Sequence, residues 1–227
     1  MKKALAVSAV ASAMVFAGCA SMTTIQTAET LPPGKSTYYV AWVPTTVPLL
    51  DTNSDGKADQ MMFQTVEAGM RLGITDRFDM GAKLFPIGLQ FDGKYQFYKE
   101  NAFKSAADLG FGWMTVTSGN FKSTLIDIIP AVPVTYRPFS WCALTLTPKM
   151  LARIATSSND STNTSSTSTY FLGGGTGSVK FTVKNLGSMI FEYGKFAGKY
   201  QTDHFALAVE KPLHLWGKDT GEEDNNQ

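Results

Sequence analysis

The sequence predicts an all-β protein, built as a single antiparallel up-and-down β-barrel of roughly ten strands, with about eight to twelve fitting the same pattern. Three observations predict this fold. Several segments alternate apolar and polar residues with a period of two. Glycine, threonine, valine and aromatic residues dominate these segments, which favours strands over helices. After residue 18, no apolar run approaches the roughly 20 residues of a membrane-spanning helix.

Residues 1–18 have the pattern of an export signal. Lysines at positions 2 and 3 precede an uncharged apolar run over residues 4–17, which predicts a signal helix that is removed by cleavage. The tetrapeptide Phe16-Ala17-Gly18-Cys19 resembles the lipobox of bacterial lipoproteins. The resemblance implies the lipoprotein export pathway, lipidation at Cys19 and, because Ala20 follows, the outer membrane of a Gram-negative bacterium. The alternative is an ordinary signal that is cut elsewhere and leaves Cys19 as a thiol.

Three further parts are expected after the signal. Residues 19–35 would form a periplasmic linker from the lipidated cysteine, residues 36–216 the barrel domain, and residues 217–227 a polar tail. Lys and Arg number 20 against 19 for Asp and Glu, and this net charge of +1 creates no strong field to attract nucleic acid. Cys142 is the only other cysteine, which excludes an intramolecular disulfide framework once Cys19 is acylated.

Alternation is clearest between Leu89 and Phe97, where apolar residues and glycine share one parity and polar residues the other. The other clear strands are expected at 62–72, 126–137, 142–154 and 205–215, and weaker ones at 36–44, 78–86, 105–117, 169–183 and 188–200. Pro130 and Pro133 weaken the strand 126–137, because proline cannot donate to a strand ladder. The alternation breaks near Gly194 and Lys195, which predicts a bulge or a misplaced strand boundary.

The two faces of the predicted strands suit a membrane, because one is apolar and the other carries charge. A backbone in lipid must satisfy all its polar groups internally, so such strands can span a membrane only as a closed barrel. With the N-terminus in the periplasm, residues 45–60 and the Ser/Thr/Asn tract 156–169 would form external loops, and residues 73–77 and 99–104 short periplasmic turns. Aromatic residues near strand ends would form interfacial girdles, although a soluble sandwich core also buries aromatics.

The charged face of these strands would line the barrel lumen. Charges of both signs in a narrow lumen favour a plug of paired side chains, since barrels of about eight strands are filled by their own side chains. The alternative is a narrow polar conduit. The expected lumen-facing residues are Glu67, Arg71, Asp79, Lys83, Asp92, Lys94, Asp108, Asp127, Arg137, Lys149, Arg153, Lys180 and Glu210.

The stretch Gly69–Lys83 resembles the strand–turn–strand unit common in small outer-membrane β-barrels of Gram-negative bacteria. The resemblance extends, as a pattern, over nearly the whole chain after the signal. It implies a structural or narrow-channel, porin-like role without catalysis, contact with outer-membrane lipid, and insertion by the barrel assembly machinery. One feature departs from such barrels, many of which end on an aromatic residue: here Trp216 is followed by the polar tail.

Two other functions remain open. A soluble, lipid-tethered, lipocalin-like barrel that binds an apolar ligand would need the opposite parity, with an apolar interior and a charged exterior. An outer-membrane lipid hydrolase could use His204 with Asp203 and a serine such as Ser188. No Gly-x-Ser-x-Gly elbow accompanies these residues, so no catalytic residues are expected.

One polar segment has the spacing of a calcium loop. Asp51, Asn53, Asp55 and Asp59 place oxygen ligands at intervals suited to a hard cation, and Gly56 permits the sharp turn. The position of the bidentate glutamate in an EF-hand is occupied by Met62. The segment is therefore either a calcium site or a polar hairpin loop, and calcium is the one cofactor that the sequence suggests.

Overall fold

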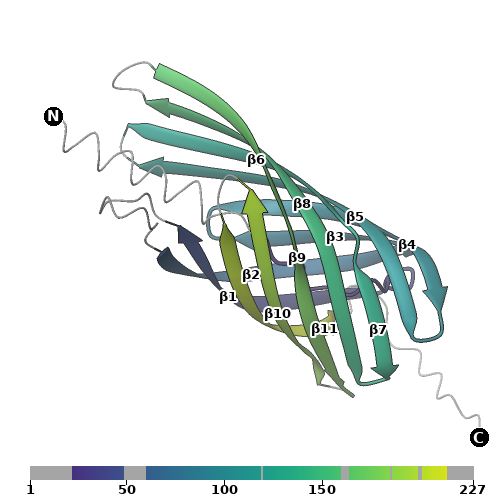
Figure 1. Cartoon of the computed structure of the whole chain (residues 1–227). Coiled ribbons are helices and arrows are strands. Elements are labelled where there is room, and N and C mark those ends of the chain that lie inside the picture. The colour runs from purple at the N-terminus through teal and green to yellow at the C-terminus, as the bar shows by residue number, and fades with distance from the viewer. Residues whose placement is uncertain are drawn as a thin grey trace, which may run out of the picture.

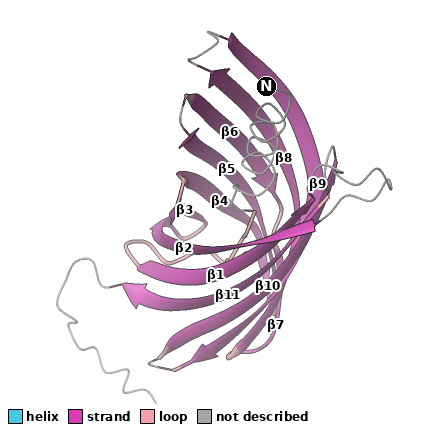
Figure 2. Ribbon diagram, turned by 90° about the vertical axis from the view of Figure 1, so that its left-hand side faces the viewer, coloured by secondary structure: helices cyan, strands magenta, loops and turns pink. Residues whose placement is uncertain are grey.

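The computed structural model describes residues 22–48, 60–118, 120–159, 164–184, 186–198 and 201–213. Within these ranges the chain forms one antiparallel sheet and no helix, and none of the described segments is an apolar helix long enough to cross a membrane. The sheet closes into a barrel (Figure 1, Figure 2). Its strands are β1 (Ser36–Pro48), β2 (Gln60–Thr75), β3 (Phe78–Phe85), β4 (Gly88–Glu100), β5 (Phe103–Ser118), β6 (Phe121–Ala131), β7 (Val134–Phe139), β8 (Cys142–Asn159), β9 (Thr164–Val183), β10 (Gly187–Gly198) and β11 (Thr202–Leu213).

The barrel has ten strand positions, because β6 and β7 share one of them. β6 lies between β5 and β8 at one end, and β7 lies between the same two neighbours at the other. The sequence predicted one strand over residues 126–137, and the structure splits it at Val132 and Pro133. Since Pro133 has no N–H to donate, the ladder is carried past it by other contacts, such as the Ala106 N–H to the Pro133 carbonyl at 3.0 Å.

All ten expected strands are present, but the expected loop and the expected irregularity in β10 differ from the structure. The Ser/Thr/Asn tract was expected to be a loop over residues 156–169, but β8 and β9 continue through most of it, with Thr156 paired to Thr167 and Ser158 to Ser165. Threonine is a good strand former, so polarity did not prevent pairing. Of the two explanations for the broken alternation near Gly194, the bulge is absent, because β10 pairs without a register shift from Gly187 to Gly198. The end of the strand differs by two residues from that of the expected strand 188–200.

The broken alternation in β10 has a physical cause inside the barrel. Gly194 points inward, and the His204 ring lies so close that an added Cβ would be 2.2 Å from its Cε1 atom. Phe196 also points inward and is completely buried, while Lys195 faces outward. The strand is therefore regular, and its apparent irregularity reflects an apolar patch on the inner wall.

The two ends of the barrel differ. We call the turn end the one that holds Ser36 at the start of β1 and the short turns after β2, β4, β7 and β9. The loop end is the opposite one, where β1 ends at Pro48 and β8 at Asn159. Every adjacent pair of strands is antiparallel, so successive strands run in opposite directions between these two ends. Two places depart from this: β6 and β7 divide one strand position, and β3 pairs with β2 only from Ala68 to Thr75.

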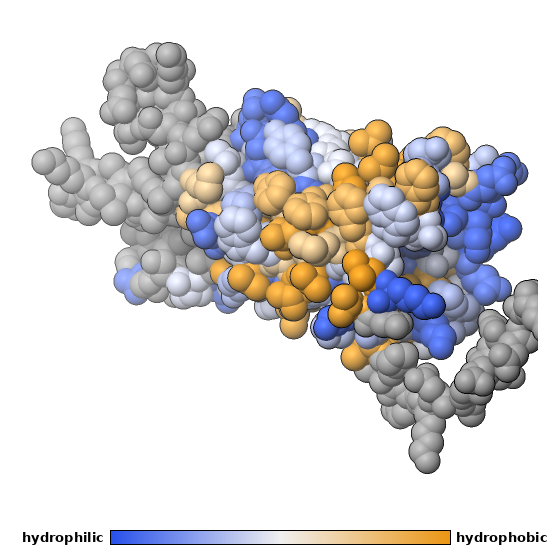
Figure 3. Space-filling view, turned by 90° about the horizontal axis from the view of Figure 1, so that it is seen from below, coloured by the Kyte–Doolittle hydropathy of each residue, from blue (hydrophilic) through white to orange (hydrophobic). Residues whose placement is uncertain are grey.

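Large apolar side chains cover the outer wall of every strand. Val40, Leu109 and Leu146 are 49%, 60% and 69% exposed, and burial alternates residue by residue along β10. Exposed charged residues lie near the strand ends, including Arg77 and Lys99 at the turn end. Figure 3 shows the result as hydrophobic side chains across the middle of the wall and hydrophilic ones gathered toward its right-hand end. This parity is the opposite of what the lipocalin-like alternative requires.

Candidate functional site: the lumen

An extended segment of the chain lies inside the barrel. Residues 22–31, which we call the plug, make hydrogen bonds to side chains of β2, β3, β4, β5, β7, β8, β9 and β10, so they are enclosed by the ring of strands. Met22, Ile25 and Ala28 are 6%, 4% and 0% exposed. The expectation of a periplasmic linker over residues 19–35 is therefore wrong for residues 22–31. Residues 22–31 are mostly polar and show no periodicity, which is typical of a linker. In the structure, side chains that face the lumen form hydrogen bonds with their backbone.

Lysine side chains of the inner wall bind carbonyl groups of the plug. Lys149 donates to the Met22 carbonyl at 2.8 Å, and Lys83 donates to the Thr23 carbonyl at 3.1 Å. Lys94 donates to two carbonyls, those of Thr27 at 2.8 Å and Glu29 at 2.7 Å. Such charge-assisted hydrogen bonds are stronger than neutral ones, and all three ammonium groups are removed from water, because the lysines are at most 6% exposed.

Oxygen atoms of the wall accept hydrogen bonds from the plug's N–H groups. Glu192 accepts from Thr24 at 2.8 Å and from Ile25 at 2.9 Å, and Thr135 accepts from Ala28 at 2.8 Å. Ile25 has a positive φ of 45°, a conformation that a β-branched residue rarely adopts. The Glu192 carboxylate binds the two successive N–H groups and so stabilises this strained geometry.

Glu29 holds the plug to the wall near the turn end of the barrel. Its carboxylate accepts from Arg137 Nε at 2.9 Å and also pairs with Arg137 Nη2 and Lys104. Burial raises the pKa of Glu29, but the hydrogen bonds from Arg137 and Lys104 and their charges lower it more, so the pKa lies below its ordinary value. The ionised form of Glu29 therefore stabilises the inserted plug.

This shift predicts that plug release depends on pH. The stabilisation is complete above the pKa of a released glutamate, about 4.3, and is lost as the pH falls through the lowered pKa of the inserted state. We expect plug release, measured as ion conductance through reconstituted barrels, to stay constant from neutral pH to about 5 and to rise below about 4. Glu29→Gln should remove this component of the rise. An unchanged pH profile in that variant would show that Glu29 does not hold the plug.

Two apolar clusters receive the hydrophobic residues of the plug. Met22 packs in a cluster toward the loop end, whose other buried members are Met114, Leu125, Ile129, Leu151, Ala155, Tyr170, Leu172 and Phe196. Ile25 packs against Ala41, Val43, Ile190, Ala206 and Ala208. The plug thus runs from the apolar loop-end part of the lumen, at Met22, to the charged turn end, at Glu29.

All thirteen charged residues expected in the lumen lie on the inner wall, in two groups. One group contacts the plug through side-chain hydrogen bonds or ion pairs: Glu67, Asp79, Lys83, Lys94, Asp108, Arg137 and Lys149. The other pairs within the wall: Arg71 with Asp79 and Asp92, Arg153 with Asp127, and Lys180 with Glu210. Mutual pairing of wall charges, as predicted from the sequence, therefore fills only part of the lumen. The plug, residues 22–31, occupies the rest of the space and binds the other charged side chains.

Sequence reasoning missed Glu192, and with it Thr135 and Lys104, among the wall residues that contact the plug. Glu192 lies between the outward-facing Phe191 and Tyr193 and is 1% exposed. Period-two alternation from Ile190 would have placed it in the lumen, but the break at Gly194 obscured the parity of this strand.

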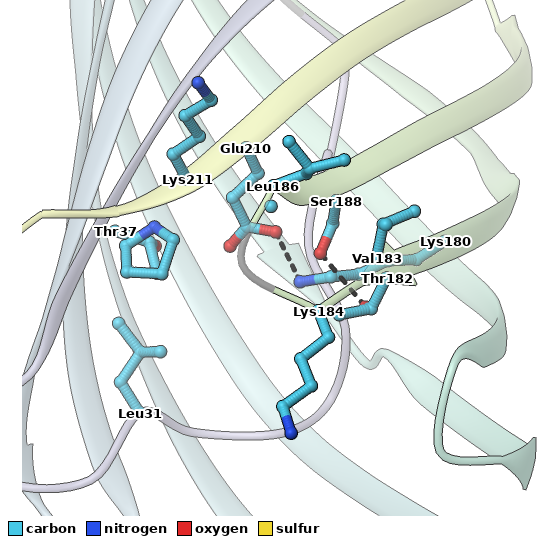
Figure 4. A pocket seen from close by; sticks show the side chains of 12 residues that line it. Leu31, Thr37, Lys180, Thr182, Val183, Lys184, Leu186, Ser188, Glu210 and Lys211 are labelled. Atoms are coloured by element: carbon cyan, nitrogen blue, oxygen red, sulfur yellow. Dashed lines mark hydrogen bonds and ion pairs between the residues drawn. The ribbon is translucent and has the colours of Figure 1, made fainter.

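Lys180 and Glu210 border a cavity of about 560 Å³ at the turn end, drawn in Figure 4. Thr182 and Ser188 share a hydrogen bond of 3.0 Å on the same side. Deeper in the lumen, a cavity of about 20 Å³ lies beside Thr23 and Lys149, which is room for about one water molecule. Beside Thr23 and Lys149, the plug thus leaves space for little more than one water molecule.

The residues of the hydrolase alternative do not come together. Ser188 pairs across the sheet with Glu210, whereas His204 pairs with Gly194, so six residues of β11, about 20 Å of strand, separate the two. His204 instead contacts Glu192 at 3.1 Å. The lipidation candidate Cys19 and the calcium candidates Asp51, Asn53, Asp55 and Asp59 lie outside the described residues.

Comparison with known proteins gives distant similarities in structure only. No family model matches the chain, and no curated protein is significantly similar to it. Ail, the attachment invasion locus protein of Yersinia pestis, is 9% identical with a TM-score of 0.41, covering 80% of this chain and 99% of that one. The outer membrane protease OmpT from Escherichia coli is 8% identical with a TM-score of 0.48, covering 82% and 100%. An outer membrane channel from Pseudomonas putida F1 is 8% identical with a TM-score of 0.47, covering 86% and 100%. Similarities this distant carry no functional argument.

Proposed function

We propose that this chain is a non-catalytic β-barrel protein of the Gram-negative outer membrane, whose lumen is closed by its own N-terminal segment. The observation that supports it best is the outer wall, where every strand presents large apolar side chains. Soluble monomers rarely expose contiguous apolar patches beyond a few hundred Å². Burying one such side chain in an apolar medium is worth about 1.5–3 kcal/mol, so lipid is the environment that this surface favours.

Aromatic residues at the turn end support the same proposal. Phe139 stacks on Trp141, with ring centroids 5.3 Å apart, and Trp141 stacks on Phe181 at 6.1 Å. Phe103 stacks on Tyr136 nearby at 4.7 Å. All five rings face outward and are between 38% and 57% exposed. Such rings are typical of the girdles that transmembrane barrels place at the membrane–water interface.

Lipidation at Cys19 is part of the proposal, and the plug constrains where the lipid can lie. Cys19 precedes Met22 by three residues, a reach of at most about 11 Å. Since Met22 packs toward the loop end, a lipid on Cys19 would meet the membrane there while the plug is inserted. We place the loop end outside the cell, on the side expected for the loop over residues 45–60, so the lipid would lie outside rather than in the periplasm. An epitope introduced after Ala20 should then be accessible on intact cells. Labelling only after outer-membrane permeabilisation would contradict this placement.

Membrane spanning is tested most simply without the lipid. The Cys19→Ala chain, expressed with its signal, should stay with the membrane in alkaline carbonate and should migrate faster on gels when it is not heated. Labelled palmitate should enter the parent chain and not the variant. Complete release of Cys19→Ala by carbonate would contradict a spanning barrel and leave only a lipid-tethered one.

A charged substitution on the outer wall should show whether that wall faces a bilayer or water. Leu146→Arg is expected to destabilise the reconstituted barrel by about 2–4 kcal/mol, because an arginine near the bilayer midplane must be dehydrated. Thr156→Arg is the matched control, since it lies on β8 with the same parity but near the loop end. Denaturant unfolding in vesicles measures both. Changes within about 0.5 kcal/mol for both variants, as expected at water-exposed sites, would contradict the proposal.

A further inference from the structure

The inner wall binds peptide groups of the plug along its whole length, from Met22 to Leu31. Lys83, Lys94 and Lys149 donate to four of its carbonyls, those of Met22, Thr23, Thr27 and Glu29. Glu192, Thr135 and Asp79 accept from the N–H groups of Thr24, Ile25, Ala28 and Leu31. These contacts use atoms that every non-proline residue possesses. They are therefore independent of the sequence of the bound segment.

Side chains of the plug make a second set of contacts. Thr23 donates to Glu67 at 2.7 Å, Gln26 donates to Asp108 at 2.6 Å, and Thr24 shares a hydrogen bond with Thr176 at 3.0 Å. Apolar pockets receive Met22 and Ile25, and cations receive Glu29. The positions between them hold threonine, glutamine and alanine, which are short or flexible. The wall also dictates the backbone conformation, because Ile25 is held at a positive φ that its own side chain disfavours.

We propose that the lumen is a binding tunnel for an extended polypeptide, that contacts with the polypeptide's peptide groups are sufficient to hold it there, and that residues 22–31 are the ligand that the chain itself supplies. A separate polypeptide of the same spacing, with apolar residues at the first and fourth positions and an acid at the eighth, can replace the plug. The barrel would then be closed by whichever polypeptide segment occupies the tunnel, whether the plug or a separate chain. Because this binding does not need a membrane, it can be tested apart from the proposed function.

The test uses the full-length chain in detergent, with its own plug weakened. Met22→Asp combined with Ile25→Asp places a carboxylate in each apolar pocket, where an unpaired charge is costly. The probes are two fluorescent decapeptides. One has the sequence of residues 22–31, and the other keeps its methionine, isoleucine and glutamate in place but permutes the remaining residues. Fluorescence anisotropy should show that both bind, with dissociation constants within about tenfold of each other.

Substitutions of lysines on the inner wall test whether the peptides bind in the lumen. Adding Lys94→Met and Lys149→Met should weaken both peptides by at least about a hundredfold, since each removes charge-assisted hydrogen bonds worth about 1.5–3 kcal/mol. Lys211→Met is the control, because Lys211 is exposed at the turn end and makes no contact with the plug among the described hydrogen bonds. Binding of the first peptide alone would show recognition by side chains, and binding that the wall substitutions leave unchanged would place the peptide elsewhere. Either result overturns the proposal.

A second measurement covers the case in which the doubly substituted chain loses its β-sheet circular dichroism. Thr27→Cys, in a background without Cys19 and Cys142, places a thiol on a plug residue that is 7% exposed in the parent. Either peptide in excess should raise the rate of maleimide labelling at position 27 by displacing the plug. Failure of both peptides to do so, or success of the first alone, would again overturn the proposal.

Discussion

Arg153→Met is expected to destabilise the barrel by about 3–5 kcal/mol, because it leaves the Asp127 carboxylate buried without its partner. Arg153 and Asp127 lie directly opposite each other on β8 and β6. Two hydrogen bonds of 2.7 Å join the guanidinium to the carboxylate, and both side chains are at most 2% exposed. Denaturant unfolding of the barrel in vesicles, followed by tryptophan fluorescence, measures the loss.

The double variant Asp127→Leu with Arg153→Met is the decisive control. Removing both charges leaves no uncompensated ion, so most of the lost stability should return, as it does for other buried pairs replaced by apolar residues. Arg77→Met, at the exposed turn after β2, should change stability by less than about 0.5 kcal/mol. If the double variant were as unstable as Arg153→Met, the loss would come from packing, and the account of this pair would be wrong.

Glu29→Ala combined with Glu192→Ala is expected to open the lumen. These substitutions remove the partners of Lys104 and Arg137 at one end of the plug and the clamp on Thr24 and Ile25 at the other. Loss of a few kcal/mol of plug binding raises the fraction of open barrels by more than about tenfold. Conductance of single barrels in planar bilayers should therefore rise from near zero in the parent to frequent openings in the variant.

Glu100→Ala is the matched control, because Glu100 is an exposed acid at the turn end of β4. It should conduct as little as the parent. A parent that conducts as much as the double variant would show that the plug leaves a conduit open. Silence of the double variant would show that the side chains of the wall fill the lumen without the plug.

The strands could be predicted from the sequence because the outer wall imposes a period of two on every one of them. Along β4, Phe91, Tyr95 and Phe97 face outward, and the polar residues Asp92, Lys94 and Gln96 between them face the lumen. Lipid requires an apolar residue at each outward position along the middle of a strand. The alternation is accordingly strong where the strand crosses the apolar belt. It weakens beyond the belt, where Ser165 and Ser166 of β9 still pair but no longer alternate.

The plug could not be predicted, because the information that positions it is distributed over the wall. Residues 22–31 carry no periodicity and little hydrophobicity. Their partners Lys83, Lys149 and Glu192 lie on three strands far apart in sequence. In the sequence, each of these side chains alone indicates only a charged residue that faces the lumen. Only the closed barrel shows that they converge on peptide groups, which have no signature in the sequence.

The most direct test of the central claim, that the apolar wall faces lipid while the lumen encloses the plug, uses the tryptophans of the outer wall. Trp42, Trp113 and Trp141 are 43%, 45% and 51% exposed and face outward, and Trp216→Phe removes the fourth tryptophan from the measurement. In vesicles whose lipids carry brominated acyl chains, fluorescence of this variant should be strongly quenched, and acrylamide in the water should have little effect. Strong quenching by acrylamide with none by the brominated lipid would place the wall in water and contradict the account.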